Sequence, residues 1–437
     1  MKMNDNYIPE IEKASKEEIK KFQENLLRIN LEYLKTHSEF YRELFSKSKI
    51  DISKIRKIED LQHIPLTTKD DLQTNNNKFV CVEKNKIIDY ITTSGTLGDP
   101  VVIAMTENDL ERLAYNECIN FICADGSSKD IYQLMTTIDR RFMAGLAYFL
   151  GVRKLGAGII RVGNGIPELQ WDSISRISPT TLISVPSFIL KIIEFAETHG
   201  IDYKKTNISK AVCIGEPLRN SDFSLNLLGS RIKEKWDIKL FSTYASSEMG
   251  TAFTECSEGK GGHHHPELII VEFLDDNDNP VHEGETGELT ITNLGVEGTP
   301  LLRFKTGDIC NFHSEPCSCG RNTIRLGPIV GRKNQMIKLK GTSLYPPAIY
   351  DVLDNIIGIE NYIVEVYTNN IGTDEILLKL GTKETDSNFL KMIKDNFRAK
   401  LRVTPDIIFE HPVEIHKLQE LGINRKPRKF IDNRKIY

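Results

Sequence analysis

The stretch Thr-Thr-Ser-Gly-Thr-Leu-Gly-Asp-Pro, residues 92–100, sets the organisation of this sequence. The apolar-rich runs 87–91 before it and 101–105 after it predict two strands. The whole pattern therefore predicts a hairpin whose tip exposes hydroxyls and backbone N–H groups. Gly95 and Gly98 allow positive φ and let another molecule approach the backbone closely. Phosphate oxygens suit such a loop, although an ordinary Ser/Thr/Gly turn has the same composition.

Composition limits the class of protein. A chain of 437 residues exceeds what one hydrophobic core supports, so we expect at least two domains. The net charge of −4 gives no basic surface for nucleic acid or an anionic membrane. No apolar run approaches the roughly 18 residues of a membrane span, and the N-terminus has no apolar signal core. These features predict a cytoplasmic protein with no nucleic-acid or membrane partner.

The order of strands and helices predicts an α/β fold. Apolar residues at helical spacing predict helix over 15–47. Strands expected between 131 and 241, the last at 238–241, alternate with helices, which predicts a parallel sheet with helices on both faces. From about residue 266 the pattern becomes antiparallel and barrel-like, as far as 330. A small α+β unit follows. We therefore expect a large N-terminal domain over 1–332 and a C-terminal domain over 333–437.

Several motifs resemble one enzyme superfamily. The loop at 92–100 resembles the phosphate loop of the adenylate-forming enzymes, which include the acyl-CoA synthetases, and the run 67–72 (Thr-Thr-Lys-Asp-Asp-Leu) is similar to a segment of the phenylacetate–CoA ligase branch. Further motifs match in the same order along nearly the whole chain. The resemblance implies an AMP-forming acid–thiol ligase that uses ATP, Mg²⁺ and coenzyme A, acts on an aryl or arylacetic acid, and has a mobile C-terminal domain.

The resemblance assigns roles to the nucleotide-binding residues. Forming an acyl adenylate requires adenine, ribose, phosphates and the carboxylate to be held in place. Tyr244 would stack on adenine, Ser247 would contact the α-phosphate, and Glu248 would hold Mg²⁺, a cation that prefers carboxylate oxygens. Asp308 would accept hydrogen bonds from both ribose hydroxyls, and Arg332 would contact ribose or phosphate. The other residues that the matching loops imply for ATP or AMP are Thr93, Ser94, Gly95, Thr96, Gly98, Gly215, Glu216 and Pro217.

The C-terminal segment 425–434 resembles the segment that carries the family's catalytic lysine. On that match Lys426 bridges the substrate carboxylate and the α-phosphate and offsets the charge that builds during adenylation. Arg425 stands where the family has glycine, so Lys429 is an alternative, and a solvated basic tail has the same composition.

Two departures from the family pattern concern activity. Asn334 stands at the expected hinge, where an aspartate is usual, and Asp99 stands where many relatives carry lysine. A carboxylate near a triphosphate repels it. These positions leave open a catalytically weakened nucleotide-binding homologue as an alternative to the active ligase.

The acyl pocket and the acceptor are the least defined parts. The sequence leaves open which acid is used, whether the acceptor is CoA, a carrier-protein thiol or an amine, and whether the protein forms a homodimer. The acid is expected to lie among Phe142, Met143, Ala144, Gly145, Tyr148 and the loop before Tyr244.

Four residues in two Gly-bounded loops predict a metal site: Cys256, His263, Cys317 and Cys319. Clustered cysteines in a reducing compartment favour metal binding over disulfides. Three thiolates and one imidazole make a closed tetrahedral zinc site, which is structural because no coordination position stays open. A similar pattern in some phenylacetate–CoA ligase relatives favours this interpretation. His264 or His265 could replace His263, and free thiols beside exposed histidines are the alternative.

Overall fold

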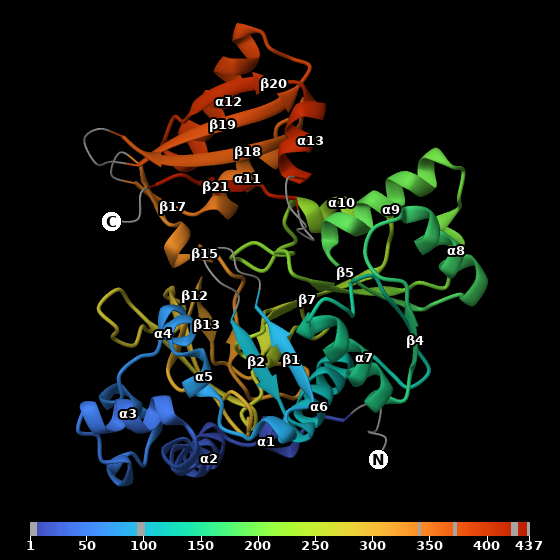
Figure 1. Cartoon of the computed structure of the whole chain (residues 1–437). Helices are drawn as coiled ribbons and strands as arrows, with labels where there is room; N and C mark the ends of the chain where they lie inside the picture. The colour runs from blue at the N-terminus through green and yellow to red at the C-terminus, as the bar shows by residue number, and fades with distance from the viewer. Residues whose placement is uncertain (1–6, 94–100, 340–341, 370–373, 421–426, 435–437) are drawn as a thin grey trace. The chain divides into compact units, whose positions relative to one another are not determined.

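The computed structural model describes residues 7–93, 101–339, 342–369, 374–420 and 427–434 (Figure 1). Its contacts divide the chain into two compact units, Met1–Thr306 with Cys310–Pro328 and Gly307–Ile309 with Ile329–Tyr437. Within the described ranges, no helix has both the length and the apolar character needed to cross a membrane.

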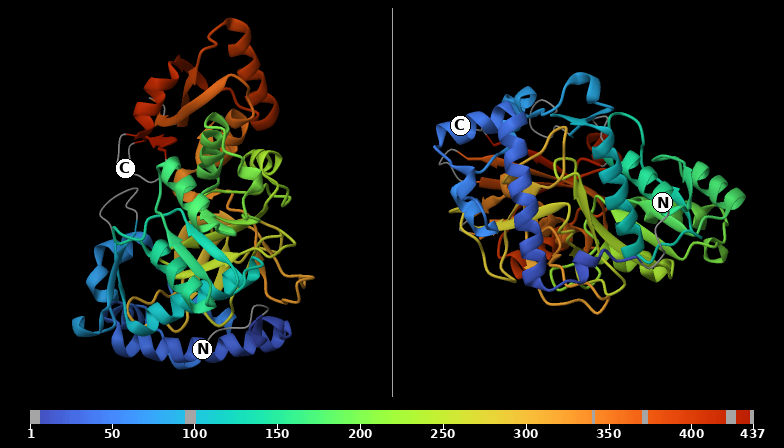
Figure 2. Two further views of the ribbon diagram at one scale, coloured as in Figure 1. Left: turned by 90° about the vertical axis from the view of Figure 1, so that its right-hand side faces the viewer. Right: turned by 90° about the horizontal axis from the view of Figure 1, so that it is seen from below.

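The first part of the larger unit is helical. A capping box begins the long helix, because Ser15 Oγ accepts from Glu18 N at 3.3 Å and the Glu18 carboxylate accepts from Ser15 N at 2.9 Å. The single helix expected over 15–47 is divided at Ser38, whose hydroxyl caps the next helix. The long helix α2 runs along one side of this unit (Figure 2), where Gln23 donates to the carbonyls of Pro266 and Ile269. The helices are α1 (Glu10–Lys13), α2 (Lys16–His37), α3 (Glu39–Lys47), α4 (Lys69–Thr74) and α5 (Asn76–Phe79).

A six-stranded sheet forms the centre of the larger unit. Its first five strands in spatial order are parallel, and the edge strand β8 is antiparallel to β7. The predicted parallel sheet is therefore confirmed, with one antiparallel edge strand added. The strand order is β4 (Gly158–Arg161), β3 (Ile131–Leu134), β5 (Thr181–Ser184), β6 (Lys210–Ile214), β7 (Lys239–Ser246) and β8 (Thr251–Thr254).

Helices cover both faces of this sheet (Figure 1). Successive residues of a strand point to opposite faces: Ile183 and Val212 pack with α6 and α7, whereas Leu182 and Ala211 pack with the helices on the other side. Because each face of the sheet packs against an apolar core, the central strands contain continuous apolar runs. The helices are α6 (Glu107–Cys123), α7 (Met143–Leu155), α8 (Pro167–Ile177), α9 (Pro186–Thr198) and α10 (Leu227–Lys235).

Antiparallel strands complete the larger unit. The predicted hairpin around the 92–100 loop is confirmed, because β1 (Asp89–Thr92) pairs with β2 (Val102–Met105). The antiparallel pattern expected from about residue 266 is also confirmed, because residues 269–274 pair antiparallel with residues 288–293. The remaining strands of this unit are β10 (Ile269–Leu274), β11 (Gly287–Asn293), part of β12 (Phe304–Cys310), and a three-stranded sheet of β13 (Phe312–His313), β14 (Arg325–Leu326) and β9 (Gly262–His263). Residues 307–309 of β12 belong to the smaller unit, where Asp308 and Ile309 pair with β15 (Gly331–Arg332).

The smaller unit is an α+β structure with its own apolar core. The strands β18 and β19 pair antiparallel in the middle of a sheet whose order is β20-β19-β18-β21. Its elements are β16 (Ile337–Leu339), β17 (Thr342–Leu344), α11 (Pro346–Asp354), β18 (Ile359–Thr368), β19 (Asp374–Thr382), α12 (Ser387–Leu401), β20 (Asp406–Glu410), α13 (Pro412–Glu420) and β21 (Phe430–Asp432).

Side chains of α6 satisfy the backbone of the edge strand β8. The Asn116 amide oxygen accepts from Ala252 N at 2.8 Å, and the Asn120 amide oxygen accepts from Thr254 N at 3.0 Å. The Asn120 amide nitrogen donates to Ala252 O at 3.1 Å. These amides take the place of a further strand, because buried backbone groups need partners.

Replacing Asn120 with alanine should therefore destabilise the fold. The change leaves Thr254 N without its acceptor, and one unsatisfied buried group costs about 1–3 kcal/mol. Thermal unfolding of Asn120→Ala beside the wild type measures this loss. An unchanged melting temperature would contradict the edge-capping role.

Candidate active site

Predicted site residues leave the central sheet at the carboxyl ends of neighbouring parallel strands. The segment Gly215–Pro217 follows β6, and the turn 247–250 follows β7. In open α/β sheets this edge is where ligands bind. The sheet therefore places two of the predicted nucleotide-binding segments along one edge.

The Glu216 carboxylate has a structural partner. It accepts from Ser187 N at 2.9 Å and from Ser187 Oγ at 2.8 Å. Ser187 lies in the first turn of α9, where the helix dipole favours a negative charge. Gly215 adopts φ +72° and Pro217 is exposed. The loop after β6 is thus tied to the neighbouring helix, and its contact with adenine stays a prediction.

Tyr244 lies within β7 and not beyond the end of a strand. The strand expected to stop at residue 241 continues to Ser246, because β8 pairs with it and places Tyr244 opposite Phe253. The two rings lie nearly parallel, at 25°, with centroids 6.2 Å apart. This pairing fixes the half-buried tyrosine, whose stacking on adenine stays a prediction.

Ser247 and Glu248 form the turn between β7 and β8 and line a small cavity. The cavity has a volume of about 20 Å³, and about 10–15 Å³ is enough for one water molecule. It accommodates a water-sized group and not an aromatic ring. Its other lining residues are Ile103, Met105, Asp109, Arg112, Met143, Met249, Gly250, Asn293, Val296 and Thr299.

The five residues expected around the acid lie at the start of α7 but have different environments. Phe142 precedes the helix and Met143 lines the cavity. Tyr148 is buried in the core, with its ring centroid 6.1 Å from that of Phe121, and Ala144 packs against the same core. Gly145 is buried against a loop, since a Cβ there would lie 1.9 Å from Thr137 O. The cavity therefore includes one of the five, and all five assignments to the acid stay predictions.

Thr93 closes the hairpin that carries the phosphate loop. Its N–H donates to Val101 O at 3.0 Å, and its hydroxyl accepts from Val101 N at 3.4 Å. Ser94, Gly95, Thr96, Gly98 and Asp99 lie outside the described residues.

Within the smaller unit, Asp308 and Arg332 lie together. They are paired across β12 and β15, and Arg332 Nε donates to Asp308 Oδ1 at 3.1 Å. The carboxylate is buried, whereas half of the arginine side chain is exposed. The two residues expected to contact the ribose thus form an ion pair, in which the Arg332 guanidinium orients the Asp308 carboxylate.

The expected hinge and the alternative lysine are both fixed by contacts inside the smaller unit. Asn334 O accepts from Arg434 Nη2 at 3.2 Å. Lys429 Nζ donates to the Tyr362 hydroxyl at 3.1 Å and lies over the Tyr362 and Tyr350 rings, 4.8 and 5.7 Å from their centroids. Lys429 is therefore held on aromatic side chains. Lys426 lies outside the described residues.

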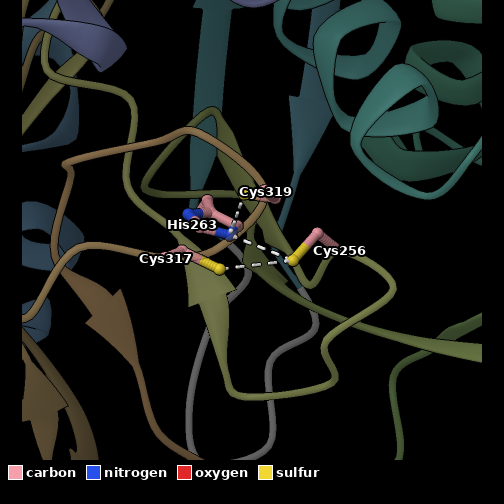
Figure 3. Close-up of side chains that lie close together, drawn as sticks. All are labelled: Cys256, His263, Cys317 and Cys319. Atoms are coloured by element: carbon pink, nitrogen blue, oxygen red, sulfur yellow. Dashed lines mark hydrogen bonds between the residues drawn. The ribbon is translucent and has the colours of Figure 1, made fainter.

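The four predicted metal ligands converge on one point (Figure 3). Cys256 Sγ lies 3.7 Å from Cys317 Sγ, and His263 Nε2 lies 3.4 Å from Cys256 Sγ and 3.5 Å from Cys319 Sγ. Zinc–ligand bond lengths in a tetrahedron give about 3.8 Å between two sulfurs and about 3.5 Å between sulfur and nitrogen. The four donor atoms fit a tetrahedral zinc ion in spacing and chemistry.

Electrostatics at this cluster also suit a cation. A hydrogen bond from Cys256 lowers the pKa of the Cys319 thiol to about 2, with a further contribution from His263. Burial lowers the pKa of His263 and favours its neutral, ligating form. His264 and His265 are engaged elsewhere, with Ile269 O at 2.6 Å and with the Glu12 carboxylate at 2.5 Å. Of the three histidines, His263 is therefore the one placed to bind a metal.

Comparison with known proteins identifies the family. The profile of the AMP-binding enzyme family matches residues 18–297, which is more than half of the chain. The chain belongs to the AMP-binding enzyme family. The match includes the hairpin at 92–100, the central sheet and the Ser247–Glu248 turn.

Curated relatives of this AMP-binding enzyme have nearly the same length. A phenylacetate-coenzyme A ligase from Thermus thermophilus is 28% identical over 98% of this chain and 93% of its own. One from Escherichia coli is 28% identical over 77% of this chain and 76% of its own, and Protein CapK of Staphylococcus aureus is 22% identical over 86% and 82%. The similarity thus extends beyond the family match, into the smaller unit.

A solved structure confirms the fold of the AMP-binding enzyme. The 2-hydroxyisobutyryl-CoA ligase in its postadenylation state superposes with a TM-score of 0.84 at 21% identity and covers 99% of this chain and 95% of that one. The expected adenylate-forming architecture is therefore confirmed.

Sequence reasoning missed two residues beside the candidate catalytic turn, Arg112 and Asn293. Both line the cavity and donate hydrogen bonds to backbone carbonyls of the turn. The sequence contains an indication of Arg112, because polar residues recur at helical spacing at positions Asp109, Arg112, Asn116 and Asn120. Such a polar stripe on a helix packed against strands indicates buried partners.

The close approach at Gly145 leads to a stability prediction. Gly145→Ala places a Cβ against Thr137 O, so α7 or the loop must move, and overpacking costs about 1–3 kcal/mol. Gly158→Ala is the matched control, since its Cβ would be 3.4 Å from the Ile131 side chain, an ordinary contact. Thermal unfolding should show a lower melting temperature for the first variant only. Equal behaviour of both variants would contradict the packing argument.

Proposed function

We propose that this chain is an ATP-dependent acid–CoA ligase that acts through an acyl adenylate, with an aryl or arylacetic acid as its substrate. The observation that carries the proposal is the near full-length similarity to phenylacetate-coenzyme A ligases. The geometry is consistent with it, since Ser247 and Glu248 lie at the edge of the sheet where a nucleotide would bind.

The first half-reaction then has assigned residues. A carboxylate oxygen of the acid attacks the α-phosphorus, the bond to the β-phosphate oxygen breaks, and pyrophosphate leaves. Glu248 would hold Mg²⁺, which when bound would neutralise phosphate charge, and Lys426 neutralises the charge that builds between acid and phosphate. The thiol of CoA then loses its proton and attacks the acyl carbon, and AMP leaves.

We propose further that residues 333–437 form a domain that rotates about the Asn334 region between the two steps. The division of contacts near residue 329 supports a boundary there. The contact between Arg434 and Asn334 O would fix the hinge backbone to the end of β21.

A pyrophosphate-release screen over carboxylic acids, with and without CoA, tests the function. The expected result is release that depends on an aryl or arylacetic acid, with an acyl-CoA product detected by mass when CoA is present. Release without an acyl-CoA product would indicate that the acceptor is a carrier-protein thiol or an amine and not CoA. Binding of ATP without any release would indicate a weakened homologue.

The two half-reactions separate the candidate lysines. Lys426→Ala should lower adenylate formation by roughly 10²-fold or more, because a preorganised charge is lost. Thioester formation from supplied acyl adenylate should survive. Lys429→Ala is the matched control and should keep adenylation, since its ammonium is held by Tyr362 and Tyr350. The reverse pattern would assign the role to Lys429, and equal loss of both steps in Lys426→Ala would refute it.

We also propose that Cys256, His263, Cys317 and Cys319 hold a structural zinc ion. The donor spacing and the lowered pKa of Cys319 support this assignment. A four-ligand site would join the segment after β8 to the 317–319 loop, and its binding free energy would contribute to folding.

Metal analysis tests the zinc proposal. Purified protein should contain about one zinc per chain, and Cys317→Ser should lose it and unfold at a lower temperature. Cys81→Ala, which changes a buried cysteine outside the cluster, should keep the metal. Protein that is free of metal and whose stability resists chelators would favour free thiols.

A further inference from the structure

The turn that carries Glu248 is held by side chains from two other elements. Asn293, at the end of β11, donates to Met249 O at 2.7 Å. Arg112, on α6, donates through Nη1 to the next carbonyl, Gly250 O, at 2.7 Å. The two carbonyls that directly follow Glu248 therefore both have fixed partners, and Gly250 turns the chain with φ +53°.

Arg112 donates hydrogen bonds from each of the three nitrogens of its planar guanidinium. Nη2 donates to Thr251 Oγ1 at 3.0 Å and to Leu268 O at 2.5 Å, and Nε donates to Leu294 O at 2.9 Å. The side chain thus joins the catalytic turn, the segment before β10 and the segment after β11. A lysine cannot reproduce this planar fork of donors.

The charge of Arg112 remains in place at neutral pH. Burial lowers its pKa to about 10, with opposing contributions from Asp109 and Glu267. Arg112 and Asn293, both held by hydrogen bonds, line the same cavity as Glu248, the residue proposed to bind the metal.

We propose that Arg112 and Asn293 are positioning residues that hold Glu248 for the binding of Mg²⁺–ATP. The inference rests on the proposed function, because Glu248 is the proposed metal ligand. Neither residue needs to touch the substrate, since each acts through a carbonyl of the turn. Outer partners of a metal ligand typically contribute 10–100-fold to metal affinity or activity.

The test measures metal affinity directly. Mn²⁺ replaces Mg²⁺, and its binding in the presence of ATP is followed by electron paramagnetic resonance, which requires no turnover. Arg112→Met should weaken Mn²⁺ binding by about 10–100-fold, and Arg112→Lys by less, because lysine can keep one donor to a turn carbonyl but loses the planar fork. Asn293→Ser should weaken it in the same direction. The concentration of Mg²⁺ that half-activates pyrophosphate release should rise in parallel.

Asn120→Ala is the matched control for simple destabilisation. It removes hydrogen bonds from the same helix to β8 but contacts none of the turn carbonyls. Its melting temperature should fall while Mn²⁺ affinity stays as in the wild type. Unchanged Mn²⁺ affinity in folded Arg112→Lys and Asn293→Ser, or an equal loss in Asn120→Ala, would overturn the inference. A wild type that binds Mn²⁺–ATP but releases no pyrophosphate would instead refute the proposed function alone.

Discussion

Strand β8 lies at the edge of the central sheet, and its buried backbone groups need partners, a constraint that ties the sheet to α6. An edge strand carries a row of N–H and C=O groups that must find partners when buried. Here the amides of Asn116 and Asn120 on α6 supply them. Because β8 ends just before Cys256, the contact with α6 fixes the strand that leads to this candidate metal ligand. A different residue of the same helix, Arg112, contacts the candidate catalytic turn.

A buried polar network continues from the end of this helix. His265 contacts Asn120 through Nε2 at 3.2 Å and Glu12 through Nδ1 at 2.5 Å. Arg321 donates to the other Glu12 oxygen at 2.7 Å and to Cys319 Sγ at 3.6 Å. The pKa of Glu12 is lowered, since His265 and Arg321 outweigh the effect of burial. Every charge in this network has a partner, which is the condition for keeping such groups in a protein interior.

Glycine and strand pairing explain why the candidate catalytic turn is tight. Gly250, the last residue of the turn, adopts a conformation that residues with side chains rarely adopt. Beyond it the chain returns along β7, so Tyr244 is fixed against Phe253 instead of lying in a loop. A rigid strand holds a side chain more accurately than a loop. The antiparallel edge strand thus fixes the position of Tyr244, the residue predicted to stack on adenine.

The sequence by itself determined the α/β class, the hairpin around residues 92–100 and the three candidate cysteine ligands, with three neighbouring histidines left open as the fourth. These follow from local periodicity, turn chemistry and residue type, which neighbours along the chain encode. The tertiary structure alone decided that β7 extends to Ser246, that His263 and not His265 joins the cysteines, and that Arg112 holds the candidate catalytic turn. The first depends on pairing with β8, and the other two depend on partners distant in sequence, such as Glu12 for His265. Local pattern cannot specify such partners, because long-range packing and hydrogen bonding decide them.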